Sequence, residues 1–210
     1  MKNIKNIIFD YGNVIFKLDF AKGKKAWKEL GIINPDQFYG HTLQDRVFDA
    51  FERGEITAGD FRTHIRLKVN NPDLTDQQID KAWNSMLIGV SDGNHDLLIK
   101  LKSKYRTFLL SNINAIHYEY IINYLKTEFN FDGNNHLFEK TYYSHLTGKR
   151  KPELAIFEQL INENNLDSNE TLFIDDSPQH IEGAAKLGLQ TYLLTAPDNI
   201  QQFFSKFKVV

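Results

Sequence analysis

The sequence predicts an α/β protein with a doubly wound parallel sheet and one all-helical insertion. The first observation is a set of short apolar runs without polar alternation, at residues 7–9, 108–110, 172–174 and 192–194. Such runs are typical of strands covered on both faces, as parallel strands are. The second is that helix-period segments alternate with these runs, which favours a parallel sheet. The third is that residues 17–89 contain several helical stretches and no convincing strand.

The spacing of apolar residues and the residue types at helix ends predict the helices. Around the sheet the helical segments are residues 94–104, 115–127, 153–164, 179–187 and 199–206. In the insertion, Thr57 and Thr75 have the residue type and position of N-caps for helices over residues 58–69 and 76–87. Gln78 stands where the partner of a capping box belongs. Residues 140–143 are compatible with one further strand.

The composition excludes several classes of function. The 210 residues include 25 Lys+Arg and 27 Asp+Glu, a net charge of −2, which gives no electrostatic reason to expect a nucleic-acid or anionic-membrane partner. The chain has no cysteine, which excludes disulfides, thiolate metal ligands and a thiol nucleophile. Neither a signal peptide nor an apolar run long enough to span a membrane is present. We therefore expect a cytoplasmic protein, either a monomer or a weak homodimer.

Polar side chains stand directly after three of the expected strands. They are Asp10 and Asn13, Ser111 and Asn112, and Asp175 and Asp176. One such group by itself is equally typical of polar residues that merely end a strand. Three groups favour a shared site, because ligands of open α/β sheets bind outside the carboxyl ends of the strands.

Carboxylates that meet in one crevice need a compensating positive charge. Two of them at about 4 Å repel by roughly 4 kcal/mol at an effective dielectric constant of about 20. The chain offers oxygen ligands and no His/Cys set, which favours Mg²⁺ over Zn²⁺. Lys151 is a candidate organic cation, although a solvated basic turn before the next helix is the simpler reading of that residue. His117 and His180 also follow these polar groups and could approach the crevice.

Four segments together carry a family resemblance. They are Phe9-Asp10-Tyr11-Gly12-Asn13-Val14, Leu110-Ser111-Asn112, Lys151-Pro152 and Phe173-Ile174-Asp175-Asp176-Ser177. In order and spacing this set resembles the four motifs of the haloacid dehalogenase-like (HAD) hydrolase superfamily. The resemblance implies a Rossmann-like core of residues 1–16 plus 90–210 and a helical C1-type cap of residues 17–89. The Tyr11-Gly12-Asn13 segment and residues 51–56 look most like the sugar-phosphate phosphatase branch, which includes bacterial α-glucose-1-phosphate phosphatase.

The resemblance implies a role for each motif residue. Asp10 would be the nucleophile that forms an aspartyl-phosphate, assisted by Ser111 and Lys151. Mg²⁺ would be held by Asp10, the backbone carbonyl of Gly12 and Asp176, with Asp175 as a direct or indirect partner. Substrate contacts would come from the motif residues and from the cap, namely from Gly12, Asn13, Asn112, Glu52 and Arg53. The substrate would be a small phosphorylated metabolite, most plausibly a sugar phosphate.

One position departs from the family pattern. Most phosphatases of the superfamily carry a second Asp two residues after the nucleophile, as acid and base, and here that residue is Gly12. A sugar 1-phosphate, whose anomeric oxygen leaves easily, would tolerate this loss. A metal-independent haloacid dehalogenase also lacks the second Asp, but the Asp175-Asp176 pair favours the phosphatase. A catalytically silent binding protein is the third reading, which the joint presence of Asp10, Ser111, Lys151 and Asp176 disfavours.

Overall fold

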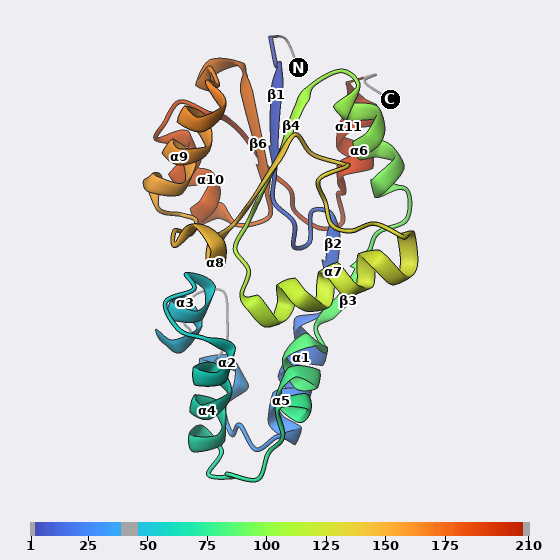
Figure 1. Ribbon diagram of the computed structural model, residues 1–210. Helices are drawn as coiled ribbons and strands as arrows, with labels where there is room; N and C mark the ends of the chain where they lie inside the picture. The colour runs from blue at the N-terminus through green and yellow to red at the C-terminus, as the bar shows by residue number, and fades with distance from the viewer. Residues whose placement is uncertain (1–2, 39–45, 208–210) are drawn as a thin grey trace.

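A five-stranded parallel sheet forms the centre of the molecule, as the sequence predicts. The computed structural model describes residues 3–38 and 46–207. The strands of the sheet are β1 (Asn6–Phe9), β4 (Arg106–Ser111), β5 (Lys140–Tyr143), β6 (Thr171–Asp175) and β7 (Gln190–Leu193). Their order is β5-β4-β1-β6-β7, and every neighbouring pair is parallel. Residues 140–143, which the sequence allowed as a further strand, do form one, β5. β1 is the central strand of the sheet (Figure 1).

Helices cover both faces of the sheet. They are α6 (Asn94–Lys102), α7 (Ala115–Phe129), α8 (Ser144–Thr147), α9 (Leu154–Asn164), α10 (Pro178–Ala185) and α11 (Ile200–Lys206), with a short 3₁₀ turn at Ser168–Glu170. Side chains of β1 alternate between the two faces, as the pleat requires. Ile8 packs with residues of α9 and α10, whereas Ile7 and Phe9 pack with residues of α6 and α11. Figure 1 shows these two pairs of helices on opposite sides of the sheet.

The segment between β1 and α6 is mainly helical but contains two strands that the sequence analysis missed. Its helices are α1 (Phe20–Glu29), α2 (Pro35–Phe38), α3 (Arg46–Glu52), α4 (Ala58–Lys68) and α5 (Asp76–Asn84). β2 (Phe16–Leu18) and β3 (Leu87–Val90) form a two-stranded antiparallel sheet at its two ends. The expected helix over residues 76–87 therefore ends early, because Leu87 pairs with Leu18. This pairing joins residues about seventy positions apart, which local periodicity does not detect.

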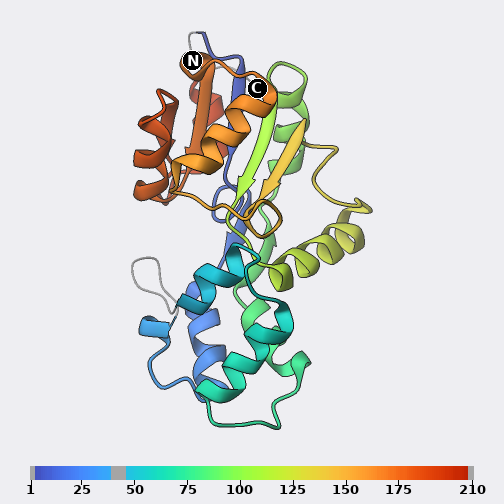
Figure 2. The same cartoon turned by 60° about the vertical axis from the view of Figure 1, so that its left-hand side comes forward.

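The helices of this segment form a bundle beyond the carboxyl ends of the sheet strands (Figures 1 and 2). Both predicted N-caps are present, at Thr57 and Thr75; Thr75 forms the predicted capping box with Gln78, and Thr57 forms a second one with Asp60. Trp83 of α5 stacks on His117 of α7, with 4.3 Å between ring centroids, so the bundle packs directly against α7. The predicted boundaries at residues 16/17 and 89/90 fall on β2 and β3, and the division into core and cap stays a prediction. Among the described residues, no helix is both long enough and apolar enough to cross a membrane.

Candidate active site

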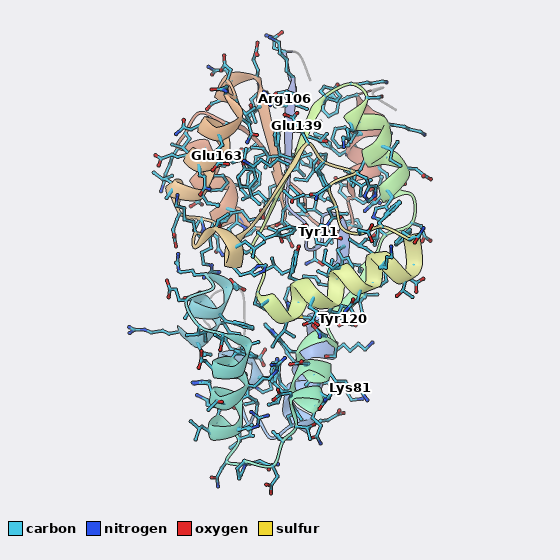
Figure 3. The ribbon with its side chains drawn as sticks, viewed as in Figure 1. Tyr11, Lys81, Arg106, Tyr120, Glu139 and Glu163 are labelled. Atoms are coloured by element: carbon cyan, nitrogen blue, oxygen red, sulfur yellow. The ribbon has the colours of Figure 1, made fainter. Side chains whose placement is uncertain are left out.

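Three carboxylates meet at the carboxyl end of the central strands. Asp10 follows β1, Asp175 is the last residue of β6, and Asp176 comes next. One oxygen atom from each lies within 4.8 Å of the others. They converge because β1 pairs with β6 and both strands end at this edge. Tyr11, the residue after Asp10, marks this end of the sheet in Figure 3.

Lys151 supplies the positive charge that the sequence analysis expected. Its side chain is completely buried, and its ammonium group donates hydrogen bonds to Asp10 Oδ1 and, at 2.7 Å, to Asp175 Oδ2. Asn112 fixes the backbone of Lys151 through two hydrogen bonds of 2.9 Å, one donated by Asn112 Nδ2 and one accepted by its Oδ1. Asn112 was expected to bind substrate; here its amide group holds the Lys151 backbone, and the substrate contact stays a prediction. The reading of Lys151 as a solvated turn residue is wrong, because the residue is buried.

Burial and the shared Lys151 ammonium group have different net effects on the pKa values of Asp10 and Asp175. Burial raises the pKa of Asp10, an effect that Lys151 opposes and the neighbouring Asp175 and Asp176 reinforce. Burial would also raise the pKa of Asp175, but Lys151 and His180 outweigh it and hold that pKa below its ordinary value. Burial lowers the pKa of Lys151, and the two carboxylates outweigh this effect, so the net shift is upward. Lys151 is therefore a permanent cation beside Asp10.

Asp175 is fully engaged by protein groups. Besides Lys151, its Oδ1 accepts a hydrogen bond of 2.8 Å from the backbone N–H of Ser177. His180 Nδ1 lies 3.0 and 3.1 Å from the two carboxylate oxygens. His180 sits in the first turn of α10, so the helix that follows β6 brings it back to the site, as the sequence analysis anticipated. These contacts suit a residue that positions Lys151 more than one that binds a metal directly.

Asn13 orients Asp176 and the turn after β1. Its Nδ2 donates a hydrogen bond of 3.0 Å to Asp176 Oδ2, and its Oδ1 accepts one of 3.1 Å from the backbone N–H of Leu18. The backbone φ of Asn13 is 54°, in the left-handed region that asparagine tolerates better than most residues. In this structure the side chain of Asn13 orders a carboxylate, and its expected substrate contact stays a prediction.

A small cavity of about 60 Å³ adjoins this cluster. Gly12, Ser111 and Asn112 line one part of it, so these predicted site residues are brought together. The space beside Gly12 is tight, because an added Cβ would meet Leu18 Cδ1 at 2.9 Å. The remaining lining includes Glu52 from α3 and His117 from α7. The proximity of His117 agrees with the sequence analysis.

The two residues expected from the helical bundle behave differently. Glu52 is 7% exposed and lines the cavity, and its Oε2 lies 2.9 Å from Arg150 Nη2. Arg53 is not among the residues that line the cavity. Its Nη1 donates a hydrogen bond of 2.7 Å to Glu153 Oε2 and thereby ties the end of α3 to the start of α9. Arg150 was not singled out from the sequence, where it reads as one more charge in a basic turn.

Known proteins resemble this chain in sequence and in fold over nearly its whole length. The model of the haloacid dehalogenase-like hydrolase family matches residues 4–188. D-ribitol-5-phosphate phosphatase of Bacteroides thetaiotaomicron is 30% identical over 191 residues, which cover 90% of this chain and 91% of that protein. A HAD family enzyme of the same organism, crystallised as a variant with magnesium and inorganic phosphate, superposes with a TM-score of 0.89 at 35% identity, covering 96% of this chain and 98% of that one.

A HAD-like family hydrolase of Porphyromonas gingivalis superposes with a TM-score of 0.87 at 28% identity, and the match covers 98% of both chains. These likenesses extend over β1 to β7 and over the helical bundle between β2 and β3. The motif order in the sequence and the parallel sheet with its carboxylate cluster lead to the same family. The chain therefore belongs to the haloacid dehalogenase-like hydrolase family and is an enzyme.

Proposed function

We propose that the protein is a Mg²⁺-dependent phosphatase that hydrolyses a small phosphorylated metabolite through an aspartyl-phosphate on Asp10. The observation that carries this proposal is the buried Lys151 ammonium group between Asp10 and Asp175, with a third carboxylate, Asp176, beside them. A phosphoryl group needs positive charge around its oxygens and a nucleophile in line with phosphorus. The cluster supplies the positive charge of Lys151 and the candidate nucleophile Asp10 next to Gly12, which lines the small cavity.

The chain's own residues divide the work. The Asp10 carboxylate attacks phosphorus, and the covalent intermediate splits one difficult displacement into two easier steps. Lys151 neutralises the phosphoryl oxygens and keeps Asp10 in place, while Ser111 donates a hydrogen bond to one of them. Asp10, the carbonyl of Gly12 and Asp176 supply the oxygen donors that suit Mg²⁺. The bound ion would add further positive charge where negative charge develops.

We propose a phosphorylated sugar or sugar alcohol as the substrate. Support comes from the relative named D-ribitol-5-phosphate phosphatase and from the polar groups of Glu52, Asn114 and His117 along the cavity. A sugar 1-phosphate remains a candidate, because Gly12 carries no acid for the leaving oxygen. The cytoplasmic location and the monomeric or weakly dimeric state also stay predictions.

Phosphate release from a metabolite panel tests this function. The panel contains glucose 1-phosphate, glucose 6-phosphate and ribitol 5-phosphate, each with Mg²⁺ or with EDTA. We expect turnover with Mg²⁺, none with EDTA and none in Asp10→Asn, because that amide cannot attack phosphorus. Asp36→Asn, an exposed carboxylate in α2, is the matched control and should retain full activity.

The same panel, extended by a 2-haloacid that is assayed by halide release, separates the alternatives. Turnover of a 2-haloacid in EDTA would identify a dehalogenase, and the Asp175-Asp176 pair argues against it. Folded wild-type protein that releases no phosphate from any compound would support a silent binding protein. Phosphate release that survives Asp10→Asn or EDTA would overturn the proposed mechanism.

A further inference from the structure

A terminal phosphate of a sugar alcohol leaves an alkoxide, which needs a proton as its bond to phosphorus breaks. A general acid for this step contributes about 10²- to 10⁴-fold to the rate. Gly12 has no side chain to supply it. We propose that Glu52, from α3 of the helical bundle, is the general acid for the leaving oxygen and the general base for the hydrolytic water. This inference rests on the proposed phosphatase function and deepens it.

Glu52 is placed where the proton is needed. It lines the same 60 Å³ cavity as Gly12 and Ser111. Its side chain is more than nine-tenths buried, and its Oε2 accepts no hydrogen bond, although Arg150 Nη2 lies 2.9 Å away as an ion-pair partner. A buried carboxyl oxygen without a hydrogen bond is costly unless a ligand completes it. A substrate hydroxyl or leaving oxygen in the cavity would do so.

Three contacts hold the end of α3 against residues 145–153, the segment between β5 and α9. Gly54 ends the helix with a φ of +68°, and a Cβ there would overlap the carbonyl oxygen of His145. Arg53 bonds to Glu153, and Asp49 pairs with Arg150. Glu52 lies between these contacts in the chain, so the backbone that carries its carboxyl group is fixed. Such fixed placement is what general acid catalysis requires.

The environment of Glu52 shifts its pKa upward from the ordinary value of a glutamate. Burial raises the pKa of Glu52, and the nearby Asp49 raises it further, while Arg150, Arg53 and Lys151 oppose the shift. A raised carboxyl pKa is what an acid that operates near neutral pH needs. His117, another titratable group of the cavity wall, is a poor acid there. Burial lowers the pKa of His117 to about 4, and its Nε2 is 3.2 Å from the carbonyl oxygen of Trp83.

The proton balance of the two steps is complete. Asp10 Oδ forms a bond to phosphorus as the bond from phosphorus to the alkyl oxygen breaks, and Glu52 gives its proton to that oxygen. The alcohol departs and Glu52 is left as a carboxylate. It then takes a proton from water as the water oxygen attacks phosphorus. Inorganic phosphate leaves, Asp10 is a carboxylate again, and Glu52 is protonated.

Two substrates that differ in their leaving group test Glu52. Wild type and Glu52→Gln are assayed with the best alkyl phosphate of the panel and with p-nitrophenyl phosphate, whose phenolate leaves without a proton. For the alkyl phosphate we expect kcat/KM of Glu52→Gln to fall by about 10²- to 10⁴-fold. For p-nitrophenyl phosphate we expect kcat/KM to be retained and a burst of nitrophenolate to appear, because only hydrolysis of the intermediate is slowed.

Glu29→Gln is the matched control, since Glu29 is an exposed carboxylate in α1 of the same helical bundle and does not line the cavity. It should keep the wild-type ratio between the two substrates and show no burst. Equal losses on both substrates in Glu52→Gln, or no loss on either, would overturn the role of Glu52. Turnover that survives Asp10→Asn would instead contradict the phosphatase mechanism itself. The experiment therefore distinguishes an error about Glu52 from an error about the proposed function.

Discussion

Lys151 places a full positive charge inside the protein, where two carboxylates replace the water that would otherwise solvate it. Its ammonium group bonds to Asp10 and Asp175, and neither carboxylate is exposed beyond a small fraction. Removing one member of a buried charge cluster leaves the others uncompensated, which typically costs about 3–5 kcal/mol. The same residue thus serves folding and the proposed chemistry.

Replacing Lys151 with Met should lower the free energy of unfolding by about 3–5 kcal/mol, measured by urea denaturation without metal. Lys140→Met is the matched control, because Lys140 pairs with Glu163 (labelled in Figure 3) at a position where both side chains are 38–46% exposed. That exposed pair should contribute less than about 1 kcal/mol. Equal losses in the two variants would show that the buried cluster is not a source of stability.

The asparagines of the site show where residue-level prediction stops. Asn13 and Asn112 were expected to contact substrate, but their amide groups bind Asp176 and the backbone of Lys151. These partners lie 163 and 39 residues away in the chain. An amide suits either role equally well, and only the folded chain selects the partner.

Helix α3 is short, yet it connects the helical bundle to the active-site edge. Its last residue, Glu52, is followed by Arg53 and Gly54, which contact Glu153 and the backbone of His145. The sequence left open whether Glu52 reaches the crevice or only stands at the end of a helix that Gly54 stops. It did not indicate Arg150 as the partner of the helix, because the ion pair joins two elements about a hundred residues apart.

Gly54→Ala should destabilise the protein and reduce kcat/KM, because the added methyl group meets the His145 carbonyl and displaces the end of α3. Gly148→Ala is the control: its φ is +69°, against +68° at Gly54, and a Cβ at Gly148 has no atom within 4 Å. Both variants incur the left-handed penalty of roughly 1–2 kcal/mol. If Gly54→Ala loses more Tm and more kcat/KM than Gly148→Ala, the difference measures the close contact with the His145 carbonyl. Identical melting temperatures would refute it.

The protein as a whole is nearly neutral, with a net charge of −2, but its charge is concentrated unevenly. Asp10, Asp175 and Asp176 share one buried corner with a single ammonium group. Burial raises the pKa of Asp10 to about 8, against an ordinary value of 3.8. A carboxyl group whose pKa is raised by folding stabilises the fold at low pH and loses that contribution as pH rises toward the raised value.

The metal-free protein should therefore lose thermal stability between about pH 7 and pH 8.5, a window above the ordinary histidine pKa of 6.5, below which the buried His95 and His117 act in the opposite direction. Mg²⁺ binds the deprotonated carboxylates, so the Tm gained on adding it should be larger at the higher pH. At 100 times the dissociation constant the gain in stability is about 2.7 kcal/mol. Asp176→Asn should abolish most of this gain. A Mg²⁺ effect that is equal at both pH values would contradict the proposed metal site.

The sequence by itself determined the parallel sheet, its helical insertion and the family, because these depend on local apolar patterns and on the order of short motifs. It also identified the carboxylates and Lys151, since each follows a strand or a turn at a characteristic spacing. Only the tertiary structure decided the pairing of β2 with β3, the hydrogen-bond partners of Asn13 and Asn112, and the placement of Glu52 in the same cavity wall as Gly12. Each of these joins residues distant in the chain, and such contacts arise from packing that no local pattern contains.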